Sequence, residues 1–188
     1  MSMIFFDTET TGLLVPEINK VDAQPYIVEI YACKTDDNFN LECEFYSRFK
    51  PPIPIPEETS KIHGIRNEDV IDCEPFKECV DELAEFFLGA NKLIGHNLPY
   101  DRSMLANELI RCDRLISFPW PPVQVCTVEM SMPIEQRRMN LSKLHQRCTG
   151  RPHEGAHHAK DDVFALVRCY HWLVENGFKD NPFSYPVG

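Results

Sequence analysis

The stretch Ile4-Phe5-Phe6-Asp7-Thr8-Glu9-Thr10-Thr11-Gly12 decides the fold of this chain. Its apolar start, residues 4–7, predicts a short and fully buried strand. Side chains two positions apart in a strand point to the same side, so Asp7 and Glu9 should place two carboxylates about 6–7 Å apart. Gly12 permits a tight exit from the strand. Two acids at this spacing also occur at ordinary solvated strand ends, so the stretch alone leaves that alternative open.

Two later blocks combine histidines with acids at the start of an expected helix. The block His96-Asn97-Leu98-Pro99-Tyr100-Asp101 leads into a predicted helix over residues 99–111, and Asp101 stands at the head of its core-facing side. A buried acid without a partner is costly, and a bound cation would offset that cost. The alternative for Asp101 is an acid at a helix N-terminus that the helix dipole stabilises.

The third block is His157-His158-Ala159-Lys160-Asp161-Asp162, which leads into a predicted helix over residues 159–175. Asp162 heads an apolar side of this helix, and His157 precedes the helix on a loop. A histidine in that place can approach the same site from the solvent side. The alternative for His157 and His158 is a surface pair or a fortuitous metal-binding tract.

The remaining patterns predict a mixed sheet covered by helices. Expected strands lie at residues 4–7, 26–34, 42–49, 92–95 and 123–126. Expected helices lie at residues 57–63, 76–88, 99–111, 141–148 and 159–175. Three strands come first and helices then alternate with two more, an order that favours an α/β fold. We expect one domain over residues 1–178 and a loose C-terminal tail over residues 179–188.

Charge and length narrow the function classes. A chain of 188 residues suits one domain with a full core. Its formal net charge of −10 argues against a broad basic surface for nucleic acid. A nuclease is still compatible with that charge, because two divalent ions would offset about four negative charges in one cleft.

Cysteines and apolar runs indicate the compartment. The eight cysteines are spread along the chain with no C-x-x-C pair, so we expect buried, reduced thiols rather than disulfides or a zinc site. No apolar run approaches the ~20 residues that span a bilayer, so no membrane association is expected. The first residues lack a basic region before the apolar stretch, and the cytoplasm is the default expectation.

Four carboxylates and a histidine together suit the hydrolysis of a phosphodiester with two metal ions. Two ions about 3.5–4 Å apart stabilise the attacking and leaving oxygens and lower the pKa of water. Magnesium binds through a few carboxylates and keeps several waters, which fits a set of acids better than a cage of histidines. A histidine that titrates near neutral pH can remove the proton of the attacking water.

In these blocks the chain resembles the DnaQ-like, or DEDDh, 3′–5′ exonuclease family. The similar segments are Phe6-Asp7-Thr8-Glu9-Thr10-Thr11-Gly12-Leu13, His96-Asn97 with Tyr100-Asp101, His157 with Asp162, and Ile62-His63-Gly64-Ile65. Each segment is weak evidence alone, but together, in this order and at these distances, they are specific. The resemblance covers roughly residues 4–174.

The resemblance implies an RNase H-like fold with a five-stranded mixed sheet flanked by helices. It also implies that two Mg²⁺ or Mn²⁺ ions are held by Asp7, Glu9, Asp101 and Asp162, and that His157 is the general base. The implied substrate contacts are Thr10, Thr11, Gly12, Leu13, His63, Asn97 and Tyr100. His63 could equally be a structural residue at the end of a helix.

The activity implied by the resemblance is the release of 5′-mononucleotides from single-stranded 3′ ends of DNA or RNA. DNA is the favoured substrate, in proofreading or repair, and a polymerase or a second copy of the chain is the expected protein partner. One alternative is a catalytically inactive RNase H-like module that binds nucleic acid or a polymerase. Another is an acidic protein that binds metal or acts in protein interaction.

Overall fold

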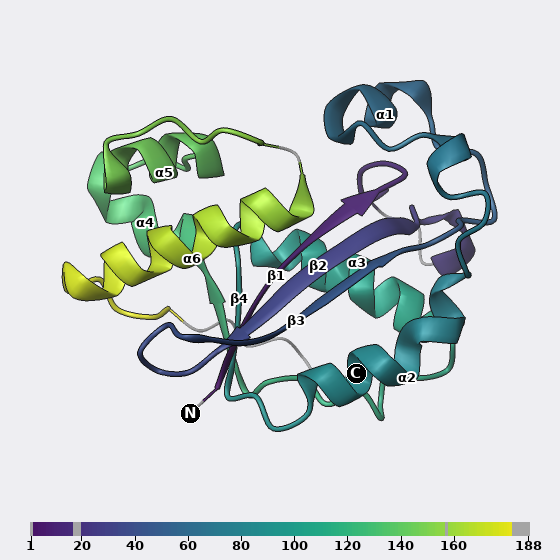
Figure 1. Ribbon diagram of the computed structural model, residues 1–188, viewed down its shortest axis with the longest axis horizontal. Helices are drawn as coiled ribbons and strands as arrows, with labels where there is room; N and C mark the ends of the chain where they lie inside the picture. The colour runs from purple at the N-terminus through teal and green to yellow at the C-terminus, as the bar shows by residue number, and fades with distance from the viewer. Residues whose placement is uncertain (1, 17–19, 157, 182–188) are drawn as a thin grey trace.

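The computed structural model describes residues 2–16, 20–156 and 158–181, and its five strands form one mixed sheet between two groups of helices (Figure 1). The strand order is β3-β2-β1-β4-β5. The strands are β1 (Met3–Thr10), β2 (Ile27–Thr35), β3 (Leu41–Arg48), β4 (Lys92–Gly95) and β5 (Val123–Cys126). The first three pair antiparallel, whereas β4 pairs parallel with both β1 and β5. The predicted mixed sheet flanked by helices is confirmed.

Within the described residues, six α-helices accompany the sheet. They are α1 (Glu57–His63), α2 (Phe76–Phe87), α3 (Leu98–Arg111), α4 (Thr127–Glu135), α5 (Leu141–Thr149) and α6 (Ala159–Glu175). Short 3-10 turns lie at Val21–Ala23 and Asn67–Asp69. The predicted helices are confirmed to within one residue at each end, and α4 is the helix that the sequence pattern did not reveal.

Helix α4 was missed because its local sequence disfavours a helix. It begins with the β-branched pair Thr127 and Val128 and contains Pro133. Tertiary contacts nevertheless hold it, since Val128 and Met130 are buried in the two hydrophobic clusters on opposite faces of the sheet. Packing of this kind routinely overrides weak helix propensity.

The alternation of β1 assigns its side chains to two different layers. Ile4 and Phe6 pack with α2 and α3 in one cluster, whereas Met3 and Phe5 pack with α5 and α6 in the other. Figure 1 shows α4, α5 and α6 on one side of the sheet and α2 and α3 on the other. Continuing this alternation past Phe6 places the odd-numbered acids of β1 on the α6 side and its threonines on the α3 side.

The cysteines agree only partly with the sequence-based expectation. All eight are free thiols, as expected. Cys33, Cys126 and Cys169 are buried, but Cys43 is exposed because it lies on the edge strand β3. The expectation of burial is therefore wrong for Cys43.

The lengths of the helices and the contacts of Asp180 bear on two further expectations, membrane association and a loose tail. Within the described part of the chain, no helix is both long enough and apolar enough to cross a bilayer. Asp180, just after the body of the domain, accepts hydrogen bonds from Lys92 and from the Tyr170 hydroxyl at 2.6 and 2.8 Å. Residues 182–188 of the expected tail lie outside the described residues.

Candidate active site

Three carboxylates from two elements meet on the α6 side of β1. Asp7 and Glu9 lie within β1, and Asp162 lies in the first turn of α6. One oxygen from each of the three lies within 4.8 Å of the others, and all three residues are half-buried. The strand predicted to end at Asp7 continues to Thr10, so both acids of β1 lie inside the strand rather than beyond it.

Asp101 approaches the same strand from α3. It is only 3% exposed, and its Oδ1 accepts hydrogen bonds from the Thr8 backbone N–H at 3.1 Å and the Thr8 hydroxyl at 2.7 Å. The ladder between β1 and β4 reaches no further than Phe5, so no strand of the described part of the chain pairs with this side of β1 at Thr8. The Asp101 carboxylate takes the place of that missing strand and thereby ties the first turn of α3 to β1.

Burial and neighbouring negative charges raise the pKa values of Asp7, Glu9 and Asp101. Burial, followed by the charges of Asp101, Glu9 and Asp162, raises the pKa of Asp7 well above its usual range. Burial and the Asp162 charge raise the pKa of Glu9 to about 8. Burial raises the pKa of Asp101 to about 7, although the hydrogen bonds from Thr8 oppose the shift. Such mutual repulsion in a protein without cations marks a place where positive charge is needed.

The donor set fits divalent cations that prefer oxygen. Carboxylates are the side chains that Mg²⁺ and Mn²⁺ bind, and the cluster of Asp7, Glu9 and Asp162 offers three of them. The pKa of Asp101 responds to the charge of Asp162, so the fourth acid is electrostatically part of the same group. No thiol belongs to the cluster, which disfavours a softer metal.

A histidine that the sequence analysis did not select contacts this cluster. The Nε2 of His153 lies 2.5 Å from Oδ1 of Asp162, and the His153 side chain is only 1% exposed. His153 lies on an irregular loop nine residues before Asp162, where no periodicity relates the two, so no sequence signal identified it. The predicted base, His157, lies outside the described residues. Its neighbour His158 is exposed and forms the N-cap of α6.

The predicted substrate contacts cluster around the turn after β1. The Tyr100 hydroxyl donates to the Gly12 carbonyl at 2.8 Å and lies 2.6 Å from the Thr10 hydroxyl. Thr11 exchanges two hydrogen bonds with the Tyr26 backbone, each 2.9 Å long. Leu13 is 80% exposed. Hydrogen bonds from Tyr100 and Tyr26 therefore fix the backbone of this turn, whereas the Leu13 side chain lies in solvent.

His63 and Asn97 lie at the edges of this region. His63 is buried, and its Nδ1 accepts a hydrogen bond from the Ile65 backbone at the end of α1, so it has a structural role at a helix end. Burial lowers the pKa of His63, an effect that the nearby Thr10 carbonyl partly opposes, although no hydrogen bond to Nε2 is complete among the described residues. Asn97 is exposed and accepts from Arg138 at 2.9 Å.

Glu29 and Arg48, which the sequence analysis also missed, form an ion pair beside the carboxylates. Glu29 of β2 is opposite Glu9 in the strand register, and Glu29 is in turn opposite Arg48 of β3. Glu29 is buried and accepts from Arg48 Nε at 2.6 Å. The signal that could have revealed Glu29 is a lone acid within the otherwise apolar run Tyr26-Ile27-Val28-Glu29-Ile30-Tyr31.

Comparison with known proteins gives consistent matches over most of the chain. The family model RNase_T, described as exonuclease, matches residues 4–170. The chain is 28% identical over 94% of its length to the DNA polymerase III subunit epsilon of Treponema pallidum, of which it covers 78%. It is 25% identical over 96% of its length to the same subunit of Buchnera aphidicola, of which it covers 75%.

Solved structures match the fold. The nuclease domain of 3′hExo, a DEDDh family member bound to rAMP, superposes with a TM-score of 0.77 at 15% identity, covering 97% of this chain and 96% of that one. Escherichia coli exonuclease I in complex with a dT13 oligonucleotide superposes with a TM-score of 0.73 at 18% identity, covering 93% of this chain and 41% of that one. The RNase H-like fold implied by the sequence resemblance is confirmed.

Proposed function

The chain belongs to the DnaQ-like exonuclease family, and on this premise we propose that it removes 5′-mononucleotides from 3′ ends of single-stranded nucleic acid with two divalent ions. The observation that carries the proposal is the convergence of Asp7, Glu9 and Asp162 within 4.8 Å, with buried Asp101 beside them. These four acids are the proposed metal ligands. Mg²⁺ or Mn²⁺ bound there would supply the positive charge that stabilises a phosphodiester displacement.

Each of the four acids and His157 has a definite part in the proposed reaction. The two acids of β1 are held in place by the sheet, and Asp101 is oriented by its two hydrogen bonds from Thr8. His157 is the proposed general base, which takes the proton of the attacking water. The family spacing of five residues to Asp162 supports this choice over its neighbour His158.

The turn after β1 is the proposed seat of the terminal nucleotide. Thr10, Thr11 and Gly12 would meet its 3′-hydroxyl through backbone groups, and exposed Leu13 would pack against its base. Tyr100 supports the proposal because its hydroxyl already reaches this turn. Asn97 and His63 are proposed as flanking contacts, although the structural role of His63 is equally supported.

The relatives favour DNA as substrate and a polymerase as partner. The two relatives compared above both bear the name DNA polymerase III subunit epsilon. We therefore infer a role in proofreading or repair, with a polymerase as the first partner to test and a second copy of the chain as the alternative. One structural neighbour is a 3′-exonuclease that recognises the 3′ end of a histone mRNA stem-loop, so RNA belongs in the substrate test.

One time course tests the proposal. Single-stranded DNA and RNA, labelled at either the 3′ or the 5′ end, are incubated with Mg²⁺, Mn²⁺ or chelator. The 3′ label should appear at once as a mononucleotide, and the 5′ label should shorten stepwise, with no reaction in chelator. Cleavage of a circular single strand would contradict the exonuclease assignment. Absence of any product with both metals would favour the inactive module.

A further inference from the structure

The face of the sheet that carries the candidate carboxylates continues past them to the edge strand. In the strand register, Glu9 is opposite Glu29 and Glu29 is opposite Arg48, while Asp7 is opposite Tyr31 and Tyr31 is opposite Tyr46. Directly paired residues point to the same face of a sheet. Two rows of side chains therefore run from the acids of β1 across β2 to the outer strand β3.

These rows form the floor of a hollow beside the start of α6. The hollow has a volume of about 430 Å³, and its lining residues are Glu29, Tyr31, Glu44, Tyr46, Arg48, His158 and Lys160. We call it the β3 groove. Its volume falls within the range of sites that bind small ligands. Because Glu29 is opposite Glu9 in the strand register, the β3 groove lies beside the carboxylate cluster on the same face of the sheet.

The β3 groove presents two cationic side chains that can bind a phosphate. Arg48 is held by Glu29 through Nε, which uses one of the five guanidinium donors. Lys160 is paired with Glu44 at 3.3 Å, but it is 58% exposed. Exposed ion pairs contribute little free energy, so Lys160 can exchange this carboxylate for a phosphate at little cost.

The β3 groove also presents an aromatic surface. Tyr46 is 55% exposed although its hydroxyl is fixed by a 3.0 Å hydrogen bond to Glu29. The ring is therefore held in place while much of its surface remains open to solvent. Bases of single-stranded nucleic acid stack on such rings with little dependence on sequence.

We propose that the β3 groove binds the nucleotide immediately 5′ of the scissile phosphate, with its base on Tyr46 and its phosphate between Arg48 and Lys160. This inference rests on the proposed function, since it assumes that the 3′-terminal nucleotide lies at the turn after β1. In this arrangement an acidic protein would hold an anionic strand through two cations, Arg48 and Lys160, that lie in one groove beside the metal site.

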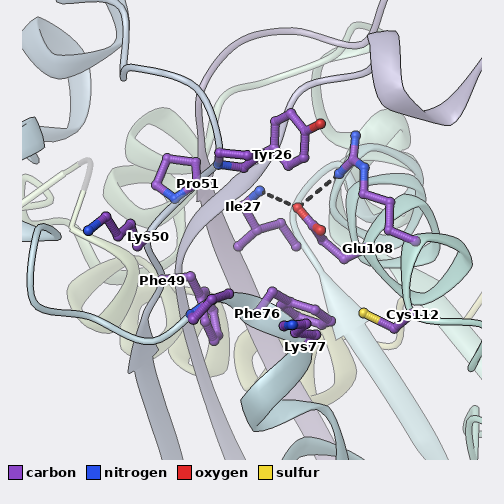
Figure 2. Close-up of a pocket in the computed structure, with 12 residues that line it drawn as sticks. Tyr26, Ile27, Phe49, Lys50, Pro51, Phe76, Lys77, Glu108 and Cys112 are labelled. Atoms are coloured by element: carbon purple, nitrogen blue, oxygen red, sulfur yellow. Dashed lines mark hydrogen bonds and ion pairs between the residues drawn. The ribbon is translucent and has the colours of Figure 1, made fainter.

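A second pocket on the opposite face of the sheet is the competing path for the strand. It has a volume of about 420 Å³ between β2, α2 and α3, and Phe49, Phe76 and Lys77 are among the residues that line it (Figure 2). The most buried cation there, Arg111, is already neutralised by Glu108 at 2.9 Å. The sheet separates this pocket from the carboxylates on the α6 side, so it does not continue the site.

The test compares two substrates in four variants. A single-stranded DNA decanucleotide fills the β3 groove, whereas the p-nitrophenyl ester of thymidine 5′-monophosphate has no nucleotide on that side of its scissile bond. Tyr46→Ala and Lys160→Ala should each raise the KM for the decanucleotide about tenfold relative to the KM for the ester. Tyr46→Phe keeps the ring and should restore the ratio to within about twofold. Lys77→Ala removes an exposed cation on the opposite face and is the matched control.

The affinity for the labelled decanucleotide, measured with Ca²⁺ in place of Mg²⁺, tests the β3 groove separately from the proposed exonuclease activity. Weaker binding by Tyr46→Ala and Lys160→Ala, with Lys77→Ala near wild type, supports the β3 groove. An equal loss in Lys77→Ala, or an unchanged KM ratio in Tyr46→Ala, overturns it. Wild-type protein that hydrolyses neither substrate would contradict the proposed function instead, and the binding comparison would still decide whether the groove holds the strand.

Discussion

At the scale of one residue, Thr8 of β1 influences the charge of an acid on a neighbouring helix, Asp101 of α3. Its side chain points to the α3 side of the sheet, where its hydroxyl donates to Asp101. This bond and that from the Thr8 backbone lower the pKa of Asp101, against the larger effect of burial. Thr8 thus favours the ionised form of Asp101, which is the form that can bind a cation.

Thr8→Val should weaken cation binding. The substitution keeps the shape of the side chain and removes the hydroxyl donor, so the pKa of Asp101 should rise further. A lost hydrogen bond to a charged group is worth about 1.5 kcal/mol, which corresponds to a roughly tenfold higher Mg²⁺ concentration for half-maximal activity. Thr8→Ser retains the donor and is the control. An identical Mg²⁺ requirement in both variants would exclude this role of Thr8.

The general base can be assigned by three variants. His157→Ala should reduce single-turnover rates roughly 10²–10⁴-fold, the range for a lost acid–base group, and should keep metal binding. His158→Ala should be milder. Asp162→Asn should lose metal binding as well as turnover, because it removes a proposed ligand. If His158→Ala were the inactive variant, the register of the third motif would be wrong by one residue.

At the scale of elements, Arg111 of α3 fastens the segment that leads into β2. Its Nη2 lies within 3.0 Å of the carbonyl oxygens of Val21, Gln24 and Pro25. Its guanidinium lies 3.8 Å from the centroid of the Tyr26 ring, and Tyr26 bonds through its backbone to Thr11. The turn proposed to hold the terminal nucleotide is therefore supported from α3.

Arg111→Ala should destabilise the protein by about 3–5 kcal/mol. The change leaves buried Glu108 without its ion-pair partner, and breaking a buried pair on one side has a cost of this size. Chemical denaturation followed by circular dichroism measures the loss. Arg147→Ala, at an exposed position of α5, should change stability by less than about 0.5 kcal/mol. Equal losses in the two variants would show that the contacts of Arg111 contribute nothing to the stability of the protein.

Elements with a clear apolar period were predictable from sequence, and those that depend on partners were not. Helix α6 spans the predicted residues because its apolar side is continuous and Asn176-Gly177 ends it. Strand β1 was predicted too short because Thr8, Glu9 and Thr10 break the apolar run. Pairing with β2 nevertheless extends the strand to Thr10.

The candidate site divides in the same way. Motif order suggested which acids belong together, and the structure brings Asp7, Glu9 and Asp162 within reach of one another, although their role as ligands stays a prediction. His153 and the pair of Glu29 and Arg48 were not found. Their positions depend on the path of a loop and on strand register, which motif spacing along one chain does not contain.

At the scale of the whole molecule, stability and metal binding are linked through pH. Glu9 and Asp101 have pKa values near 8 and 7 in the folded protein, above their usual values near 4. The stability that they contribute is present below about pH 4 and is lost as pH rises through 7 to 8. Half-buried His96, whose pKa burial lowers to about 4, acts in the opposite direction, because its contribution to folding stability is lost as pH falls below about 6.5.

The stabilisation by Mg²⁺ should therefore grow with pH. In chelator the four acids repel one another once ionised, whereas bound cations favour the ionised form and stabilise only the folded state. The difference in Tm between saturating Mg²⁺ and chelator should be small at pH 5 and largest near pH 8. His96 contacts Thr127 and Met139 rather than the acids, so its effect is common to both conditions and cancels in the difference. Scanning calorimetry at several pH values gives the two curves. Parallel curves would mean that the carboxylate cluster does not bind the cation. A carboxyl group must lose its proton before it can coordinate a cation, so the stabilisation by the cation has to depend on pH.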